Sequence, residues 1–150
     1  MSYDFPQRPR RNRRSAAVRG LVRETHLTPD HLIFPLFVLD GANRREPIVS
    51  MPGIDRVTED HALREVESAM ELGVSSFVLF PAVDDAFKDT KASYGVSKEN
   101  FYLRIARAIK SRFPEAWLMS DVAMDPYSSD GHDGVLQEGQ IVNDLTLPIL

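Results

Sequence analysis

Residues 120–134 (SDVAMDPYSSDGHDG) hold the densest group of side chains that could do chemistry. Side chains alternate between the two faces of a strand, so Asp121, Ala123 and Asp125 are expected on one face. The loop that follows can return three more polar side chains to this place: Asp130, His132 and Asp133. Converging carboxylates can bind a hard cation such as Mg²⁺, or share a proton because neighbouring like charges raise one pKa. The alternative is a solvated loop in which Asp and Gly serve only as turn residues.

Other kinds of site are excluded by composition or spacing. The chain has no cysteine, which removes disulfides, thiolate zinc sites and thiol nucleophiles. The acidic loop lacks the ligand spacing of an EF-hand, and no glycine loop has the spacing that cradles phosphates. No apolar run approaches the roughly 18 residues of a membrane span, and the arginine-rich N-terminus is no secretory signal. We therefore expect a cytoplasmic protein.

The elements around this segment alternate between strand and helix. Apolar runs predict strands at 32–39, 74–83 and 116–122, and helical spacing predicts a helix between the cap Thr58 and Gly73. A second helix is expected to open at Ser97 or Asn100 and to end at Phe113-Pro114, and residues 143–150 resemble a cap and first helical turn. Residues 42–57 are expected to be a loop with a tight turn at 51–53.

This order of elements predicts an α/β protein with a parallel sheet. Asp125 would then lie at the carboxyl end of a strand, where α/β proteins place their sites. Three strands leave two exposed edges, and parallel sheets are normally covered on both faces. We therefore interpret the chain as the front part of a longer protein.

The charge is divided unevenly along the chain. Residues 1–23 contain seven arginines and one acidic residue, a net charge of +6, whereas the whole chain has a net charge of −4. Such a basic arm on an acidic body is typical of nucleic-acid binding, or of docking on a partner or a second copy.

From about residue 6 to residue 150 the sequence resembles the porphobilinogen synthase family, also called δ-aminolevulinic acid dehydratase. The matching segments are 8–14 (RPRRNRR), 21–25 (LVRET), 32–38 (LIFPLFV), 45–48 (REPI), 50–53 (SMPG), 121–127 (DVAMDPY), 131–134 (GHDG) and Asn143-Asp144. The resemblance implies a TIM (β/α)₈ barrel whose N-terminal arm wraps a neighbouring subunit in a homo-octamer. Residues 1–27 would be this arm and residues 28–150 about the first three βα units. The arm's arginines would then serve assembly rather than nucleic acid or membrane binding: Arg8, Arg10, Arg11, Arg13 and Arg14.

The same resemblance implies the chemistry. The family condenses two molecules of 5-aminolevulinate to porphobilinogen with loss of two waters, in haem and other tetrapyrrole synthesis. Zinc-dependent members hold their metal with cysteines at the positions of Ala123, Asp125 and Asp133, so zinc is not expected here and Mg²⁺ is the expected assisting or allosteric ion. Asp121 stands at the family's pocket aspartate and is the expected catalytic-site carboxylate. Asp130 departs from the family's pattern, in which a histidine is common at this position.

The family's two Schiff-base lysines and the residues that bind the substrate carboxylates come after residue 150. None of the four lysines matches the family's lysine motifs: Lys88, Lys91, Lys98 and Lys110. We therefore expect this chain to be inactive, and aggregated or molten, when it is alone. Two alternatives stay open: a non-catalytic relative that assembles with full-length subunits, and a basic-armed nucleic-acid binder.

Overall fold

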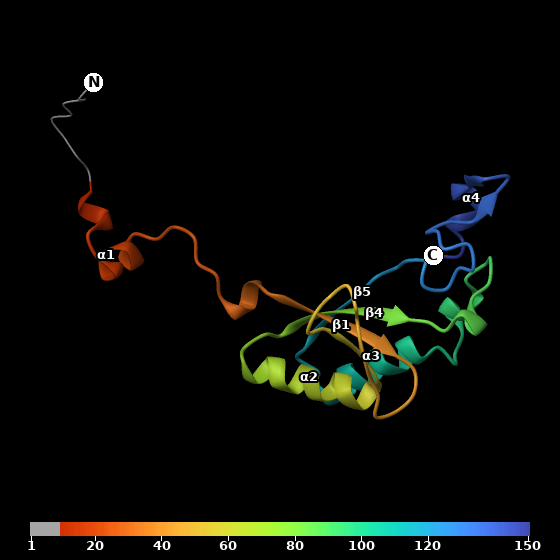
Figure 1. The fold of residues 1–150 in the computed structure, drawn as a ribbon, viewed down its shortest axis with the longest axis horizontal. Helices are drawn as coiled ribbons and strands as arrows, with labels where there is room; N and C mark the ends of the chain where they lie inside the picture. The colour runs from red at the N-terminus through yellow and green to blue at the C-terminus, as the bar shows by residue number, and fades with distance from the viewer. Residues whose placement is uncertain (1–9) are drawn as a thin grey trace, which may run out of the picture.

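The structure, a computed structural model, describes residues 10–150 (Figure 1). The main elements are β1 (Ile33–Leu39), α2 (Glu59–Glu71), β4 (Ser76–Ala82), α3 (Phe101–Arg112) and β5 (Trp117–Ser120). The short strands are β2 (Arg45–Pro47), β3 (Asp55–Val57), β6 (Leu136–Gln137) and β7 (Gln140–Ile141). The short helices are η1 (Arg11–Arg13), α1 (Ala16–Leu21), η2 (Pro29–His31), η3 (Asp85–Phe87), η4 (Ser93–Val96) and α4 (Asn143–Thr146). Among the described residues, no helix is both long and apolar enough to cross a bilayer.

The central sheet has the order β2-β3-β1-β4-β5. Strands β1, β4 and β5 run parallel, as the strand–helix alternation predicts, and α2 and α3 precede β4 and β5. The prediction of a loop at 42–57 is wrong in part, because β3 pairs parallel with β1 and β2 pairs antiparallel with β3. Strands of three residues are too short to show an alternating pattern. The tight turn at 51–53 is confirmed: the amide of Ile54 bonds the carbonyl of Met51 at 3.0 Å, and Gly53 has φ of 85°.

Two prolines lie inside the strands, where each has a paired neighbour on one side only. Pro35 of β1 faces Val78 of β4, but pairing with β3 begins only at Phe37. Pro81 of β4 pairs with β1, but pairing with β5 ends at Leu79. A proline is tolerated in a strand where its missing N–H interrupts no ladder.

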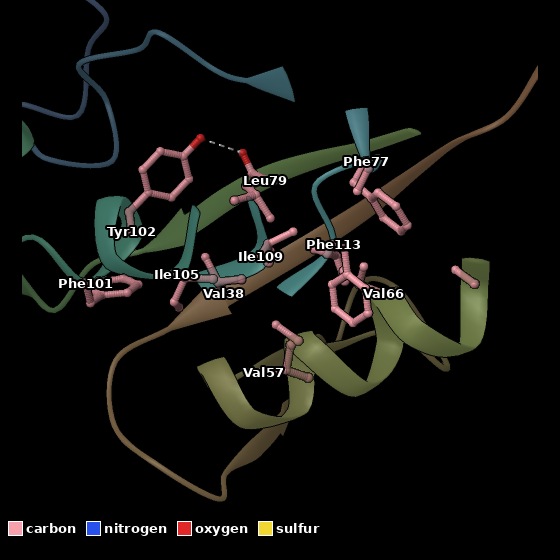
Figure 2. Close-up of a cluster of buried hydrophobic side chains, with 14 residues drawn as sticks. Val38, Val57, Val66, Phe77, Leu79, Phe101, Tyr102, Ile105, Ile109 and Phe113 are labelled. Carbon is pink, nitrogen blue, oxygen red and sulfur yellow. Dashed lines mark hydrogen bonds between the residues drawn. The ribbon is translucent and has the colours of Figure 1, made fainter. Parts of the chain in front are cut away.

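The core lies between the sheet and the two long helices, which cover the same face (Figure 1). Figure 2 shows the side chains that fill this layer, with Val66 of α2 and Ile105 of α3 opposite Val38 and Leu79 of the sheet. All four are fully buried. At the edge of the layer the Tyr102 hydroxyl donates to the carbonyl of Leu79 at 3.2 Å, and burial raises the pKa of Tyr102 to about 12.

The opposite face of the sheet has no helix over it in the described part of the chain. Alternation places Phe37 and Phe80 on this face, where their rings stack at a centroid distance of 5.4 Å and an angle of 24°. Further along the face, Ile33 is 47% exposed and Trp117 is 57% exposed. In the (β/α)₈ barrel that the resemblance predicts, this face would be the interior, and three parallel strands with helices on the other face agree with an open section of such a barrel.

The structure adjusts the predicted ends of several elements. Thr58 is the N-cap of α2, as expected, but its hydroxyl donates to Asp60 at 2.7 Å instead of accepting a bond from the helix. Asn100, not Ser97, caps α3. The third strand ends at Ser120, earlier than the prediction of 122, and residues 121–123 belong to no helix or strand.

The basic segment extends away from the sheet (Figure 1). Its described side chains are exposed apart from the half-buried Val18, and Arg8 lies outside the described residues. The segment joins the body at Pro29, which packs so closely on Gly73 that a Cβ there would lie 3.3 Å from the Cβ of Pro29. The predicted boundary after residue 27 stays a prediction.

Candidate functional site

The predicted chemical segment lies at the carboxyl ends of the parallel strands, where two loops meet (Figure 1). One loop follows β4 and the other follows β5. The amide of Asp89 bonds the carbonyl of Tyr127 at 3.2 Å, and the amide of Ser129 bonds the carbonyl of Asp89 at 3.1 Å. The two loops are therefore a single packed unit above the sheet.

Asp133 closes the second loop back on its own start. Its Oδ1 accepts hydrogen bonds from the backbone amides of Met124, at 2.9 Å, and Asp125, at 3.1 Å. The pKa of Asp125 is raised above its ordinary value by partial burial, by the charge of Asp133 and a hydrogen bond with it, and by the charge of Asp121. The structure thus brings three of the predicted carboxylates into one electrostatic group.

The other residues that the sequence predicted for this site lie outside the cluster of Asp121, Asp125 and Asp133. Ala123 is half-buried and offers no ligand atom. The side chains of Asp130 and His132 make no hydrogen bond within residues 10–150, and His132 is exposed. The cluster of carboxylates therefore has three members: Asp121, Asp125 and Asp133.

This group does not form a complete metal site. Across the described residues, no three His, Asp or Glu side chains are arranged to hold a metal ion. Two of the carboxylates are adjacent, but one oxygen of Asp133 is already engaged by two amides. Structural zinc takes four ligands, often thiolates, and the cluster of Asp121, Asp125 and Asp133 offers only carboxylate oxygens. The geometry suits a carboxylate pair that orders the loop.

Asn100 joins the loops to helix α3, a role that sequence reasoning missed. Its side chain is 1% exposed, and its Oδ1 accepts the amide of Tyr102 at 3.0 Å as a helix cap. Its Nδ2 donates to the carbonyl of Gly95 at 3.0 Å and to the Tyr127 hydroxyl at 3.3 Å. Ser97, the alternative cap, has only one hydroxyl, whereas an asparagine has a separate NH₂ donor beside its oxygen. This difference in side-chain chemistry could have favoured Asn100 from the sequence. Asn100 therefore fixes the turn that carries Asp125.

A buried threonine holds the far end of the second loop. The Thr146 hydroxyl accepts the amide of Val135 at 2.9 Å and donates to the carbonyl of Val142 at 2.8 Å. Gly134 lies so close to the side chain of Ile141 that a Cβ would collide with it. The segment after Asp133 is thus fastened to the β6–β7 hairpin and α4.

Asp121 borders two hollows. The larger, about 710 Å³, lies beside the edge strand β5 and α3 and is mostly apolar. The smaller, about 250 Å³, lies on the open face of the sheet and is lined by eight residues: Phe37, Arg56, Phe80, Pro81, Ala82, Asp121, Asp125 and Pro126. A carboxylate between an apolar wall and an aromatic floor can hold an ammonium group or accept a proton.

The lysines that the structure places in contacts are used structurally. Lys110 Nζ donates to the carbonyls of Pro114 and Ala116, both at 2.7 Å, and Lys88 pairs with Asp85 at 2.8 Å. A Schiff-base lysine must be desolvated or beside another cation, so that its pKa falls. Neither of these two has such surroundings.

Comparison with known proteins gives a consistent result. A family model described as delta-aminolevulinic acid dehydratase matches residues 6–150. The delta-aminolevulinic acid dehydratase of Bradyrhizobium diazoefficiens is 46% identical over 149 residues, which is 99% of this chain and 42% of that protein. The Chlamydia pneumoniae enzyme of the same name is 42% identical, over 99% of this chain and 45% of its own length. This chain spans less than half of the relatives that it matches.

A solved structure agrees with these sequences. It is the delta-aminolevulinic acid dehydratase (porphobilinogen synthase) of Toxoplasma gondii ME49, crystallised in complex with the reaction product porphobilinogen. It superposes with a TM-score of 0.91 and 46% identity, over 97% of this chain and 42% of that one.

Proposed function

Because the chain belongs to the delta-aminolevulinic acid dehydratase family, we propose that the protein containing it condenses two molecules of 5-aminolevulinate to porphobilinogen, releasing two waters. The observation that supports this most is the TM-score of 0.91 to a relative that was crystallised with porphobilinogen. The protein would then be a lyase of haem or other tetrapyrrole synthesis that acts in the cytoplasm.

In this proposal Asp121 is the pocket carboxylate. It follows β5 at the carboxyl end of the sheet and borders both the apolar hollow and the aromatic one. A carboxylate at this place can orient the substrate's ammonium group and accept a proton during condensation. The influence of its charge on Asp125 supports its facing the same space.

The pair Asp125 and Asp133 has a structural role in the proposal. Asp133 orders the start of the loop through two amides, a role that a metal ion and its ligands could otherwise have. A Mg²⁺ requirement would be an assisting or allosteric one, because Mg²⁺ needs near-octahedral coordination, which this pair alone does not supply.

The remaining functions come from other parts of the protein. The Schiff-base lysines would lie outside residues 1–150, so this chain contributes a wall of the pocket and not its nucleophile. The exposed arginines at 10, 11, 13 and 14, together with Arg8, would hold a neighbouring subunit of a homo-octamer. Assembly without catalysis is the outcome to expect if the protein has no such lysines.

The test is formation of porphobilinogen from 5-aminolevulinate by the protein purified from its natural source, or made from its natural coding sequence. Asp121→Asn should lower kcat by about 100-fold or more, the usual effect of losing a positioned acid–base group. Asp30→Asn, an exposed aspartate near the arm, is the matched control and should leave kcat unchanged. No product from the unaltered protein would reject the proposed function.

A further inference from the structure

The pairing of β4 with β5 stops just before Asp121, and a proline of β4 explains why. The amide of Trp117 bonds the carbonyl of Ser75 at 2.8 Å. Because the amides of a strand point alternately to its two sides, the amide of Asp121 also points to β4, at the carbonyl of Leu79. The next bond of the ladder would need an N–H from Pro81, which has none. The ladder therefore cannot continue past Asp121.

The hydroxyl of Tyr102 lies at this end of the ladder (Figure 2). Tyr102 reaches it from α3, is 5% exposed, and donates to the carbonyl of Leu79 at 3.2 Å. Burial raises the pKa of Tyr102 to about 12, and hydrogen bonds with the Asp121 backbone and the Ser120 side chain oppose this rise. One protonated hydroxyl thus contacts both strands at the place where their pairing stops.

The side chain of Asp121 is directed away from Tyr102. Ser120 is in register with Leu79, whose side chain is in the core, so alternation directs Asp121 to the open face of the sheet. There it lines the hollow of about 250 Å³ together with Phe80. Tyr102 belongs to the helical layer on the other face and lines only the larger of the two hollows. Its hydroxyl can therefore hold the backbone of Asp121 without filling the smaller hollow.

We propose that Tyr102 is a positioning residue, whose hydroxyl fastens the end of β5 to β4 and thereby fixes where the Asp121 carboxylate lies. The part of Asp121 in the condensation belongs to the proposed function, on which the catalytic side of this inference rests. A carboxylate that orients an ammonium group or accepts a proton must lie within hydrogen-bond reach of it, so a small displacement of its backbone lowers the rate. A phenylalanine at this position would fill the same space without this link.

The first part of the test measures the end of β5 without reference to any reaction. Hydrogen exchange is followed by mass spectrometry in the natural protein, in Tyr102→Phe and in Tyr94→Phe. Tyr94 is the matched control, because its hydroxyl also donates to a carbonyl, that of Glu99 at 3.0 Å, and accepts an amide, that of Phe101 at 3.4 Å. A peptide covering 117–123 should exchange about fivefold faster in Tyr102→Phe, the effect of one lost hydrogen bond, and should be unchanged in Tyr94→Phe.

The second part measures porphobilinogen formation in a double-mutant cycle. Tyr102→Phe should lower kcat about 10-fold and change KM by less than about twofold. In an Asp121→Asn protein the same change should lower kcat by less than about twofold, because the group that Tyr102 positions is already disabled. Tyr94→Phe should leave kcat unchanged. A merely structural role of Tyr102 would lower kcat by the same factor with and without the Asp121 carboxylate.

Unchanged exchange at 117–123 in Tyr102→Phe overturns the inference, and so does the same loss of kcat in both backgrounds. If Tyr102→Phe does not fold, Ser120→Ala, which removes a hydroxyl bonded to Tyr102, decides by the same two measurements. If Asp121→Asn has no measurable rate, Asp121→Glu, which displaces the carboxylate, replaces it in the cycle.

The two measurements also separate this inference from the proposed function. A protein that forms no porphobilinogen, but exchanges faster at 117–123 in Tyr102→Phe, refutes the proposed function alone. A protein that forms porphobilinogen, with the same loss of kcat from Tyr102→Phe in both backgrounds, refutes this inference alone.

Discussion

Replacing Asn100 with alanine should loosen two places in the molecule at once. The buried side-chain amide caps α3 through Tyr102 and fixes the loops at the carboxyl ends of the strands through Gly95 and Tyr127. Loss of an asparagine N-cap costs about 1 kcal/mol. Loss of each of the other two hydrogen bonds costs about 1 kcal/mol more. The local opening free energy should thus fall by about 3 kcal/mol, which is about a 150-fold change in the opening equilibrium.

Hydrogen exchange measured by mass spectrometry on the natural protein reports this opening directly. Peptides covering 101–105 and 124–130 should both exchange faster in Asn100→Ala. Asn100→Asp is the matched control, because its carboxylate can still cap the helix but cannot donate to Gly95. It should keep protection at 101–105 and lose it at 124–130. Tyr127→Phe removes one bond, so a change of about fivefold is expected at 124–130 only.

The reasoning would be refuted by unchanged exchange at 124–130 in Asn100→Ala. It would also be refuted if Asn100→Asp opened the helix start and the loop by the same factor. Either result would show that the cap and the loop contact are not separable functions of this one side chain.

Three further predictions concern the isolated chain, zinc and pH. Residues 1–150 expressed alone should bind a hydrophobic dye and show no cooperative melt, because the open sheet face leaves Ile33 and Trp117 exposed; a sharp reversible melt would contradict this. The natural protein should emerge from gel filtration without stoichiometric zinc by elemental analysis, and one bound zinc per chain would argue against the role given to Asp133. Asp133→Asn should lower the pKa of Asp125. A raised carboxyl pKa makes stability fall as pH rises from the unfolded value of 3.8 through the folded one. Burial of Asp125 and the charge of Asp121 remain in the variant, so its urea midpoints should show a smaller slope with pH; an unchanged slope would count against the coupling.

The main strands and helices could be predicted because their patterns are long. Seven apolar residues in β1 and the helical spacing of Ala62, Val66 and Ala69 leave little choice of element. Strands β2 and β3 could not be predicted, since Asp55–Val57 is a strand only because β1 offers it a parallel edge. The early end of β5 likewise depends on where its partner stops pairing.

The candidate site likewise has a part that the sequence could predict and a part that it could not. The order of elements predicts that the acidic segment lies at the carboxyl end of the sheet, and the structure places it there. The predicted strand geometry for Asp125 was wrong, because this residue lies in a turn after the strand has ended. The hydrogen bonds of Asn100 join residues from different elements, and a one-dimensional pattern does not contain such contacts.

The most direct test of the central claim is the intact mass of the natural protein after incubation with 5-aminolevulinate and borohydride. The account predicts a chain heavier than 16.9 kDa that gains the mass of one substrate, less one water and plus two hydrogens, on a lysine outside residues 1–150. A chain of 16.9 kDa with no adduct would contradict it and favour a relative that acts by assembly alone.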